Sequence, residues 1–159
     1  MTEATQQDQQ FLTRVMALAQ RARDAGHHPF AALVVGADGA VIADAMNASA
    51  SDRTAHAEMN ALRLASARFS PAELAGATLY SNAEPCAMCA GGTYWSGVGR
   101  VVYALSERSL LELTGSDPEN PTLSLPCRDV FARGQRPTEV LGPLREDEAR
   151  AAHQGFWHR

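Results

Sequence analysis

The sequence predicts a single α/β domain in which helices cover both faces of one sheet. Helical and strand patterns alternate along the chain in the order α-β-β-α-β-α-β and then β-α. The length of 159 residues suits one domain. Hydrophobic residues make up 45 % of the chain and charged residues 20 %, a globular composition that can bury a core without disulfides. We therefore expect residues 1–159 to form one domain.

The first half of the chain alternates helix and strand patterns, with turn signals between them. Apolar residues recur every three or four positions in the first helical pattern, and Gly26 is a suitable terminator. The tetrapeptide GADG at 36–39 predicts a hairpin turn between two strands. The expected elements are a helix over 11–22, strands over 29–35 and 40–45, a polar loop over 47–54 and a helix over 56–68.

The second half continues the alternation to residue 105 and then becomes irregular. Between residues 106 and 126, LLEL at 110–113 is compatible with one helical turn, whereas GSDPENPT at 115–122 is loop chemistry. We leave this segment unassigned. The other expected elements are strands over 77–82, 100–105 and 138–142, a helix over 85–95 and a last helix that begins near 144.

Charge and cysteine content exclude several classes of protein. The formal net charge of −4 offers no general attraction for nucleic-acid phosphates. Three cysteines, an odd number, argue against a secreted disulfide framework and favour a reducing cytoplasm. The polar, acidic N-terminus does not resemble a signal peptide, and no apolar run approaches the roughly 20 residues of a membrane span. We expect a cytoplasmic protein with no membrane partner.

Two cysteines follow a proline at the expected start of a helix. Cys86 and Cys89 are three positions apart, so on a helix they share one face, and the positive helix N-terminus favours thiolates. This spacing is a common zinc half-site. Upstream, His56 begins another predicted helix. If the two helix N-termini face each other, these three residues can bind zinc and leave its fourth position open for water.

Glu58 lies two residues beyond His56 and is not itself an expected ligand. Zinc lowers the pKa of a bound water, and a nearby carboxylate can hold and pass the released proton. Other interpretations stay open at this point. A cytosolic C-x-x-C motif can be a redox pair or a structural feature, and Cys127 or His153 could complete a purely structural zinc site.

The motifs H-A-E at 56–58 and P-C-A-M-C at 85–89 resemble the H-x-E…P-C-x-x-C signature of zinc-dependent base deaminases. The resemblance to the cytidine deaminase-like superfamily covers about residues 11 to 104. It implies a three-layer α/β/α sandwich around a mixed five-stranded sheet. It also implies one zinc ion on the three ligands above, with water or hydroxide as the fourth ligand, and Glu58 as proton shuttle. The implied reaction replaces an exocyclic amine with oxygen and releases ammonia, and the implied assembly is a homodimer.

Further similarity points to the bacterial guanine deaminases and related nucleoside deaminases. TAHAEMNALR at 54–63 and the Tyr94-Trp95 pair are typical of that branch. The resemblance implies a second catalytic acid beyond the last core strand, for which Asp117 is the candidate and Glu119 a rival. In some guanine deaminases the C-terminal tail closes over the active site, which we expect here for residues 144–159. The expected substrate-binding residues are Phe30, Asn47, Ala57, Trp95 and Trp157.

The sequence thus favours a deaminase of a purine base or nucleoside, with guanine-type substrates preferred. The tRNA adenosine deaminases share TAHAE and EPCAMCAG, but an RNA enzyme needs clustered basic residues that this acidic chain lacks in its C-terminal tail. Cytosine or cytidine deamination is a third possibility. A zinc-stabilised binding or scaffold protein without catalytic activity is the alternative from another class, since fold alone does not confer function.

Overall fold

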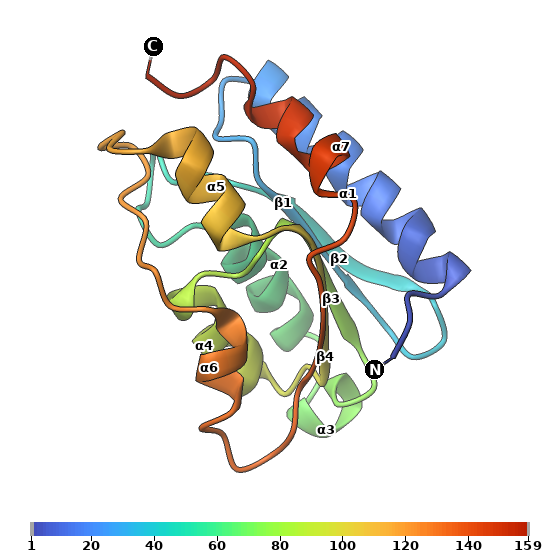
Figure 1. Ribbon diagram of the computed structural model, residues 1–159. Helices are drawn as coiled ribbons and strands as arrows, with labels where there is room; N and C mark the ends of the chain where they lie inside the picture. The colour runs from blue at the N-terminus through green and yellow to red at the C-terminus, as the bar shows by residue number, and fades with distance from the viewer. Residues whose placement is uncertain (1, 159) are drawn as a thin grey trace.

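A computed structural model describes residues 2–158 of the chain (Figure 1). No helix within this range is both long and apolar enough to span a membrane. The helices are α1 (Gln6–Asp24), α2 (Ala57–Ser66), α3 (Pro71–Leu74), α4 (Ala87–Ser96), α5 (Glu107–Thr114), α6 (Cys127–Phe131) and α7 (Glu146–Arg150), which a 3₁₀ turn (Ala151–His153) follows. The strands are β1 (Ala31–Val35), β2 (Val41–Met46), β3 (Thr78–Ala83), β4 (Arg100–Leu105) and β5 (Glu139–Leu141).

The strands form one five-stranded sheet in the order β2-β1-β3-β4-β5. β1 runs antiparallel to both β2 and β3, whereas β3, β4 and β5 run parallel to one another. This confirms the mixed sheet that the sequence predicts. Because β3 and β4 are parallel neighbours, their carboxyl-terminal residues Ala83 and Leu105 lie side by side. The segments that follow these two strands therefore leave the sheet at the same edge.

Helices cover both faces of the sheet, which confirms the three-layer sandwich. α1 and α7 lie on one face, and α2, α4 and α6 lie on the other (Figure 1). Each face has its own buried apolar cluster, which includes Leu12 and Tyr80 on the α1 side and Leu62 and Leu79 on the α2 side. Successive β3 side chains thus point to opposite layers, as strand geometry requires.

Asp8 anchors α1 to the sheet through an unusually complete set of hydrogen bonds. Its carboxylate accepts the N–H of Thr5, which completes a capping box at the helix start. It also accepts the Tyr80 hydroxyl at 2.7 Å and two Arg100 N–H groups at 2.6 and 2.9 Å. Although burial opposes ionisation, the Arg100 hydrogen bonds and the others hold the pKa of Asp8 well below its usual range.

The structure differs from the sequence expectation mainly at helix boundaries. α1 begins at Gln6 rather than near residue 11, because Thr5 caps it. α5 fills the first part of the segment that the sequence leaves unassigned, and its cap is the Ser106 side chain, which accepts the Ser109 N–H. The sequence predicts neither of the short helices α3 and α6. The last helix begins at Glu146 rather than near residue 144 and already ends at Arg150, where a 3₁₀ turn follows.

Candidate active site

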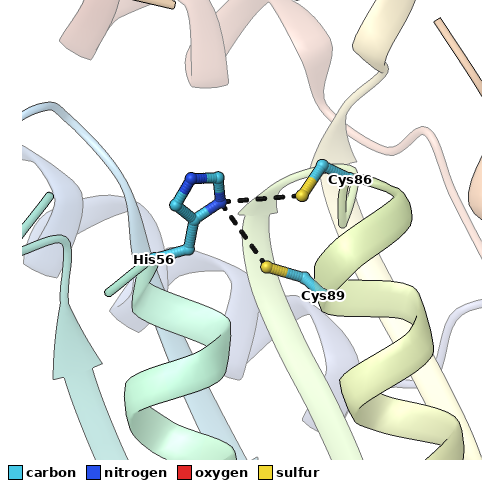
Figure 2. Close-up of side chains that lie close together, drawn as sticks. All are labelled: His56, Cys86 and Cys89. Atoms are coloured by element: carbon cyan, nitrogen blue, oxygen red, sulfur yellow. Dashed lines mark hydrogen bonds between the residues drawn. The ribbon is translucent and has the colours of Figure 1, made fainter. Parts of the chain in front are cut away.

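The two predicted motifs meet beside the carboxyl end of β3. His56 is the N-cap residue of α2, Cys86 is the N-cap residue of α4, and Cys89 lies three residues further along α4. The Nδ1 atom of His56 lies 3.6 Å from each of the two cysteine sulfur atoms (Figure 2). Together the three side chains form a group whose ligand atoms all lie within 4.8 Å of one another.

The spacing of these atoms suits a tetrahedral zinc ion. Zn–S bonds of about 2.3 Å and Zn–N bonds of about 2.0 Å at tetrahedral angles place nitrogen and sulfur roughly 3.5 Å apart. The observed N–S distances of 3.6 Å agree with this value. Within residues 2–158, the group includes neither Cys127 nor His153. Three protein ligands with an open fourth position are the pattern of a catalytic zinc site rather than a structural one.

The environment of Cys86 favours a metal-binding thiolate. Hydrogen bonding from the Cys89 thiol, with a further contribution from His56, lowers the pKa of Cys86 to about 4 although burial opposes the change. The hydrogen bond to Cys86 in turn raises the pKa of His56. Because the thiolate is the form of cysteine that binds metals, the lowered pKa of Cys86 favours the binding of a cation.

Glu58 lies in the first turn of α2 and points toward the same cluster. Its side chain is buried, with 5 % exposure, and burial is the main cause that raises its pKa. The Ser81 hydroxyl donates to Oε1 at 2.8 Å, and Oε2 lies 3.6 Å from the Cys89 sulfur. A buried carboxyl group with a raised pKa beside three candidate metal ligands is suited to take up and release protons.

A cavity of about 500 Å³ opens beside the cluster, and His56, Glu58 and Cys86 form part of its wall. Phe30 and Asn47, both expected at the substrate, also line it. The volume lies within the range of roughly 300–1,000 Å³ that is typical of small-molecule sites.

Asn47 presents its amide nitrogen without a partner from the described residues. Its Oδ1 atom accepts both the backbone N–H and the hydroxyl of Ser49, at 2.9 and 2.8 Å. The amide NH₂ makes no hydrogen bond within residues 2–158, so it is free to donate to a ligand in the cavity.

Asp117 and Glu119, the candidate second acids, occupy different positions. Asp117 does not line the cavity of about 500 Å³ beside His56. Its carboxylate accepts the backbone N–H groups of Glu119 and His158, at 2.9 and 2.6 Å, and these hydrogen bonds lower its pKa. Glu119 does line this cavity of about 500 Å³, where its carboxylate lies 3.2 Å from His28 Nε2 and 4.0 Å from Arg53.

The C-terminal tail folds against its own chain rather than away from it. Trp157 is 7 % exposed and donates its indole N–H to His153 Nδ1 at 3.2 Å. Its ring packs near Phe30 and His28, at centroid distances of 6.1 and 5.2 Å. Trp157 lines a second cavity of about 290 Å³, which shares His28, Asn47 and Glu119 with the first.

The two remaining expected substrate residues lie outside both cavities. Ala57 is fully buried in the core of α2, and neither cavity reaches it. Trp95 stands near the end of α4 with 81 % exposure and packs against Tyr94, at a ring centroid distance of 5.5 Å. The structure of one chain therefore does not bring Trp95 to the cavity.

Sequence reasoning missed four charged or titratable residues of the cavity wall: His28, Arg53, Glu84 and Glu107. Glu84 and Glu107 follow the adjacent ends of the parallel strands β3 and β4. Ligand sites in α/β sheets lie outside the carboxyl ends of the strands, so this rule could have found both glutamates.

Comparison with known proteins agrees with this geometry. Residues 5–105 match the family described as the cytidine and deoxycytidylate deaminase zinc-binding region. A probable cytosine deaminase of Schizosaccharomyces pombe is 40 % identical over 157 residues, which is 98 % of this chain and 96 % of that protein. The guanine deaminase of Bacillus subtilis is 39 % identical over 105 residues, or 64 % of this chain and 67 % of that enzyme.

Solved structures show the same relationship. The guanine deaminase of Nitrosomonas europaea superimposes with a TM-score of 0.73 at 30 % identity, over 96 % of this chain and 85 % of that one. A protein solved in complex with 2,6-diaminopurine superimposes with a TM-score of 0.74 at 32 % identity, over 96 % of this chain and 82 % of that one. The chain therefore belongs to the zinc-binding cytidine and deoxycytidylate deaminase family.

Proposed function

We propose that this protein is a zinc-dependent hydrolytic deaminase of a purine base or nucleoside, with guanine-type substrates favoured. The observation that carries the proposal is the position of Glu58. This carboxyl lies beside three residues spaced for a catalytic zinc ion and faces a cavity large enough for a small molecule. A purely structural metal site has no need of such a group.

The residues of the chain divide the chemistry among them. His56, Cys86 and Cys89 would hold the zinc ion, which when bound would supply a water molecule of lowered pKa. Glu58 would take up a proton from the attacking water and deliver a proton to the leaving amine, so that water and the amine substrate become the oxo product and ammonia. Ser81 holds Oε1 and thereby fixes the direction of the other carboxyl oxygen.

Substrate binding rests on Asn47 and Phe30 in this proposal. The free amide N–H groups of Asn47 donate to acceptor atoms on the base, and the Phe30 ring forms a wall for a flat heterocycle. The guanine preference is supported by the guanine deaminases among the sequence and structural relatives. The cytosine alternative has support of its own, because the S. pombe relative matches nearly the whole chain.

We favour Glu119 over Asp117 as the second acid that assists proton transfer, because only Glu119 lines the cavity that contains Glu58. Asp117 would act indirectly, by holding the tail through the His158 N–H. Glu119→Gln should therefore lower kcat, while Asp117→Asn should mainly raise KM through a looser tail.

A cytoplasmic homodimer is part of the proposal. The strongly exposed indole of Trp95 supports it, since a large exposed aromatic side chain can be buried by a second copy of the chain. Sedimentation of the wild-type protein and of Trp95→Ser would test this point.

Ammonia release by the zinc-loaded protein tests the function. The panel contains guanine, guanosine, adenosine, cytosine and cytidine, and the Glu58→Ala variant is the blank. We expect release from a guanine compound and none from the variant. Ammonia release from cytosine alone would show that cytosine, and not guanine, is the substrate. If the zinc-loaded protein released no ammonia from any compound of the panel, the proposal would be rejected.

A further inference from the structure

Two glutamates stand at the adjacent ends of β3 and β4, and neither has a role in the proposed reaction. Glu84 follows β3 and immediately precedes the Pro85-Cys86 turn, and Glu107 is the first residue of α5, two positions beyond β4. Both line the cavity that contains Glu58. The parallel pairing of β3 with β4 is what brings them to one wall.

Both oxygen atoms of the Glu84 carboxylate accept hydrogen bonds from the backbone. Its Oε2 accepts the N–H of Glu107 at 2.9 Å, and its Oε1 accepts the N–H of Cys127 at 3.0 Å. The backbone N–H of Glu84 donates to the Leu105 carbonyl at 2.7 Å. One side chain therefore fixes the first residues of α5 and α6 against the turn that carries the metal ligands.

Glu107 is in the opposite situation. Its side chain is 9 % exposed, and the backbone N–H of Leu125, which donates to the Leu123 carbonyl at 2.8 Å, is the one donor that interacts with it among residues 2–158. Two basic residues of the wall, Arg53 and His28, lie against Glu119 instead. Burial and the nearby Glu84 charge raise the pKa of Glu107 to about 7. A carboxyl group offers about four acceptor positions, so Glu107 retains acceptor capacity toward the cavity.

We propose that Glu107 is a further substrate-contacting residue, which accepts a hydrogen bond from an N–H group on the edge of a heterocyclic amine, and that Glu84 is its positioning residue. This inference rests on the proposed function and narrows its substrate class. The substrate carries at least one N–H donor besides the reacting amine, as guanine does. Glutamates outnumber arginines in the wall, with Glu58, Glu84, Glu107 and Glu119 against Arg53, which disfavours phosphorylated substrates.

A binding experiment separates a ligand contact from a structural role. It uses zinc-loaded protein that carries Glu58→Gln, so that no ligand is consumed, and compares it with the same protein that also carries Glu107→Gln. The ligands are guanine and analogues that each lack one N–H donor through methylation or removal of the amine. Glu112→Gln is the matched control, because Glu112 is an exposed residue of the same helix and pairs with Arg150.

We expect Glu107→Gln to weaken guanine binding at least ten-fold and the control to leave it unchanged. One analogue should bind both proteins equally, because it lacks the donor that Glu107 contacts. An equal loss for guanine and every analogue would overturn the contact in favour of a structural role. Unchanged guanine affinity, or no guanine binding to the Glu58→Gln protein, would also overturn it.

The positioning role of Glu84 has its own readout. Glu84→Gln should weaken guanine binding less than Glu107→Gln does and should leave the zinc content unchanged. In the double variant, Glu84→Gln should cause no further loss of guanine affinity beyond that of Glu107→Gln. Full additivity would show that Glu84 does not act through Glu107. If the donor-specific loss is found but the active enzyme releases no ammonia, the contact stands and the proposed function fails by itself.

Discussion

Asp8 and Glu58 are two buried carboxyl groups on opposite faces of the same sheet. Each lies in the first turn of a helix, Asp8 in α1 and Glu58 in α2, and they are 1 % and 5 % exposed. Their partners are consecutive residues of β3, since Tyr80 donates to Asp8 and Ser81 donates to Glu58. Solvent exposure and helix position are therefore nearly the same for both.

The number and charge of the donors make the difference. Asp8 receives the Tyr80 hydroxyl, the Thr5 N–H and two N–H groups of Arg100, and its pKa is lowered. Glu58 receives the Ser81 hydroxyl and lies near the Cys89 sulfur, and its pKa is raised. A buried carboxyl that is paired with a cation stabilises the fold in its ionised form, whereas one with fewer and uncharged donors is suited to proton transfer.

The largest expected effect concerns the metal beside Glu58. Cys86→Ser should reduce the zinc content from about one ion per chain to a small fraction, and should lower the thermal unfolding midpoint, because metal binding is coupled to folding. Metal analysis after gel filtration measures it. Cys127→Ser, which changes a buried cysteine outside the cluster, should keep its zinc. Full zinc content in Cys86→Ser would refute the ligand assignment.

The next effect addresses Glu58 itself. Glu58→Gln should lower kcat by about 10²- to 10⁴-fold, the usual contribution of a general acid or base. Zinc content and the free energy of unfolding should stay at the wild-type level, since the amide is isosteric and less costly to bury. Steady-state kinetics and denaturant unfolding on one preparation test both parts. Loss of zinc together with activity would remove the proton-shuttle role.

Asp8→Asn should show the reverse pattern. The free energy of unfolding should fall by about 3 kcal/mol, as for a buried ion pair that loses one partner, while kcat per folded molecule stays unchanged. Because the pKa of Asp8 is lowered by folding, its stabilisation is present above the ordinary pKa of about 4 and is lost as the pH falls below it. The free energy of unfolding of Asp8→Asn should therefore fall less than that of the wild-type protein as the pH is lowered below about 4. Asp24→Asn, at the exposed end of α1, is the control.

His153 is a third buried ionisable group, and its expected effect on stability is smaller than that of Asp8. Burial, with the nearby Arg23 charge, lowers the pKa of His153 from 6.5 to about 4. The folded state therefore keeps this imidazole neutral, and its stability should fall by about 2 kcal/mol as the pH drops from about 6.5 to about 4. His153→Phe should flatten that part of the stability profile, and His158→Gln should not. An unchanged slope in His153→Phe would contradict this assignment.

Local patterns were sufficient to predict the parts of the fold that depend on neighbouring residues. β4 coincides with the predicted strand over 100–105, and the α2 and α4 helices begin beside the residues that carry the motifs. Bringing His56 to the two cysteines required only that two helix N-termini meet. The family resemblance added the number of the strands and the mixed character of the sheet, whereas the strand order comes from the structure.

The rest depended on contacts between distant segments. α6 is five residues long and its first N–H binds Glu84, so its helical pattern alone is too short to predict it. Asp117 and Glu119 are equally acidic in the sequence, and only the folded tail shows that Asp117 binds the His158 N–H while Glu119 lines the cavity. Glu84 and Glu107 are far apart in the sequence, and the pairing of β3 with β4 brings them to one wall of the cavity.

The cavity is assembled from two stretches of the chain, of which only the first lies within the region that matches the family. The metal cluster and Glu58 lie between residues 56 and 89, inside the region that matches the family, whereas Glu107, Leu110 and the wall over 118–123 lie beyond residue 105, where that match ends. Changes in the later stretch can thus alter which molecule fits without touching the candidate metal ligands or Glu58. The names of the relatives, for cytosine, for guanine and for tRNA adenosine, are what one metal-binding region combined with different cavity walls would lead to.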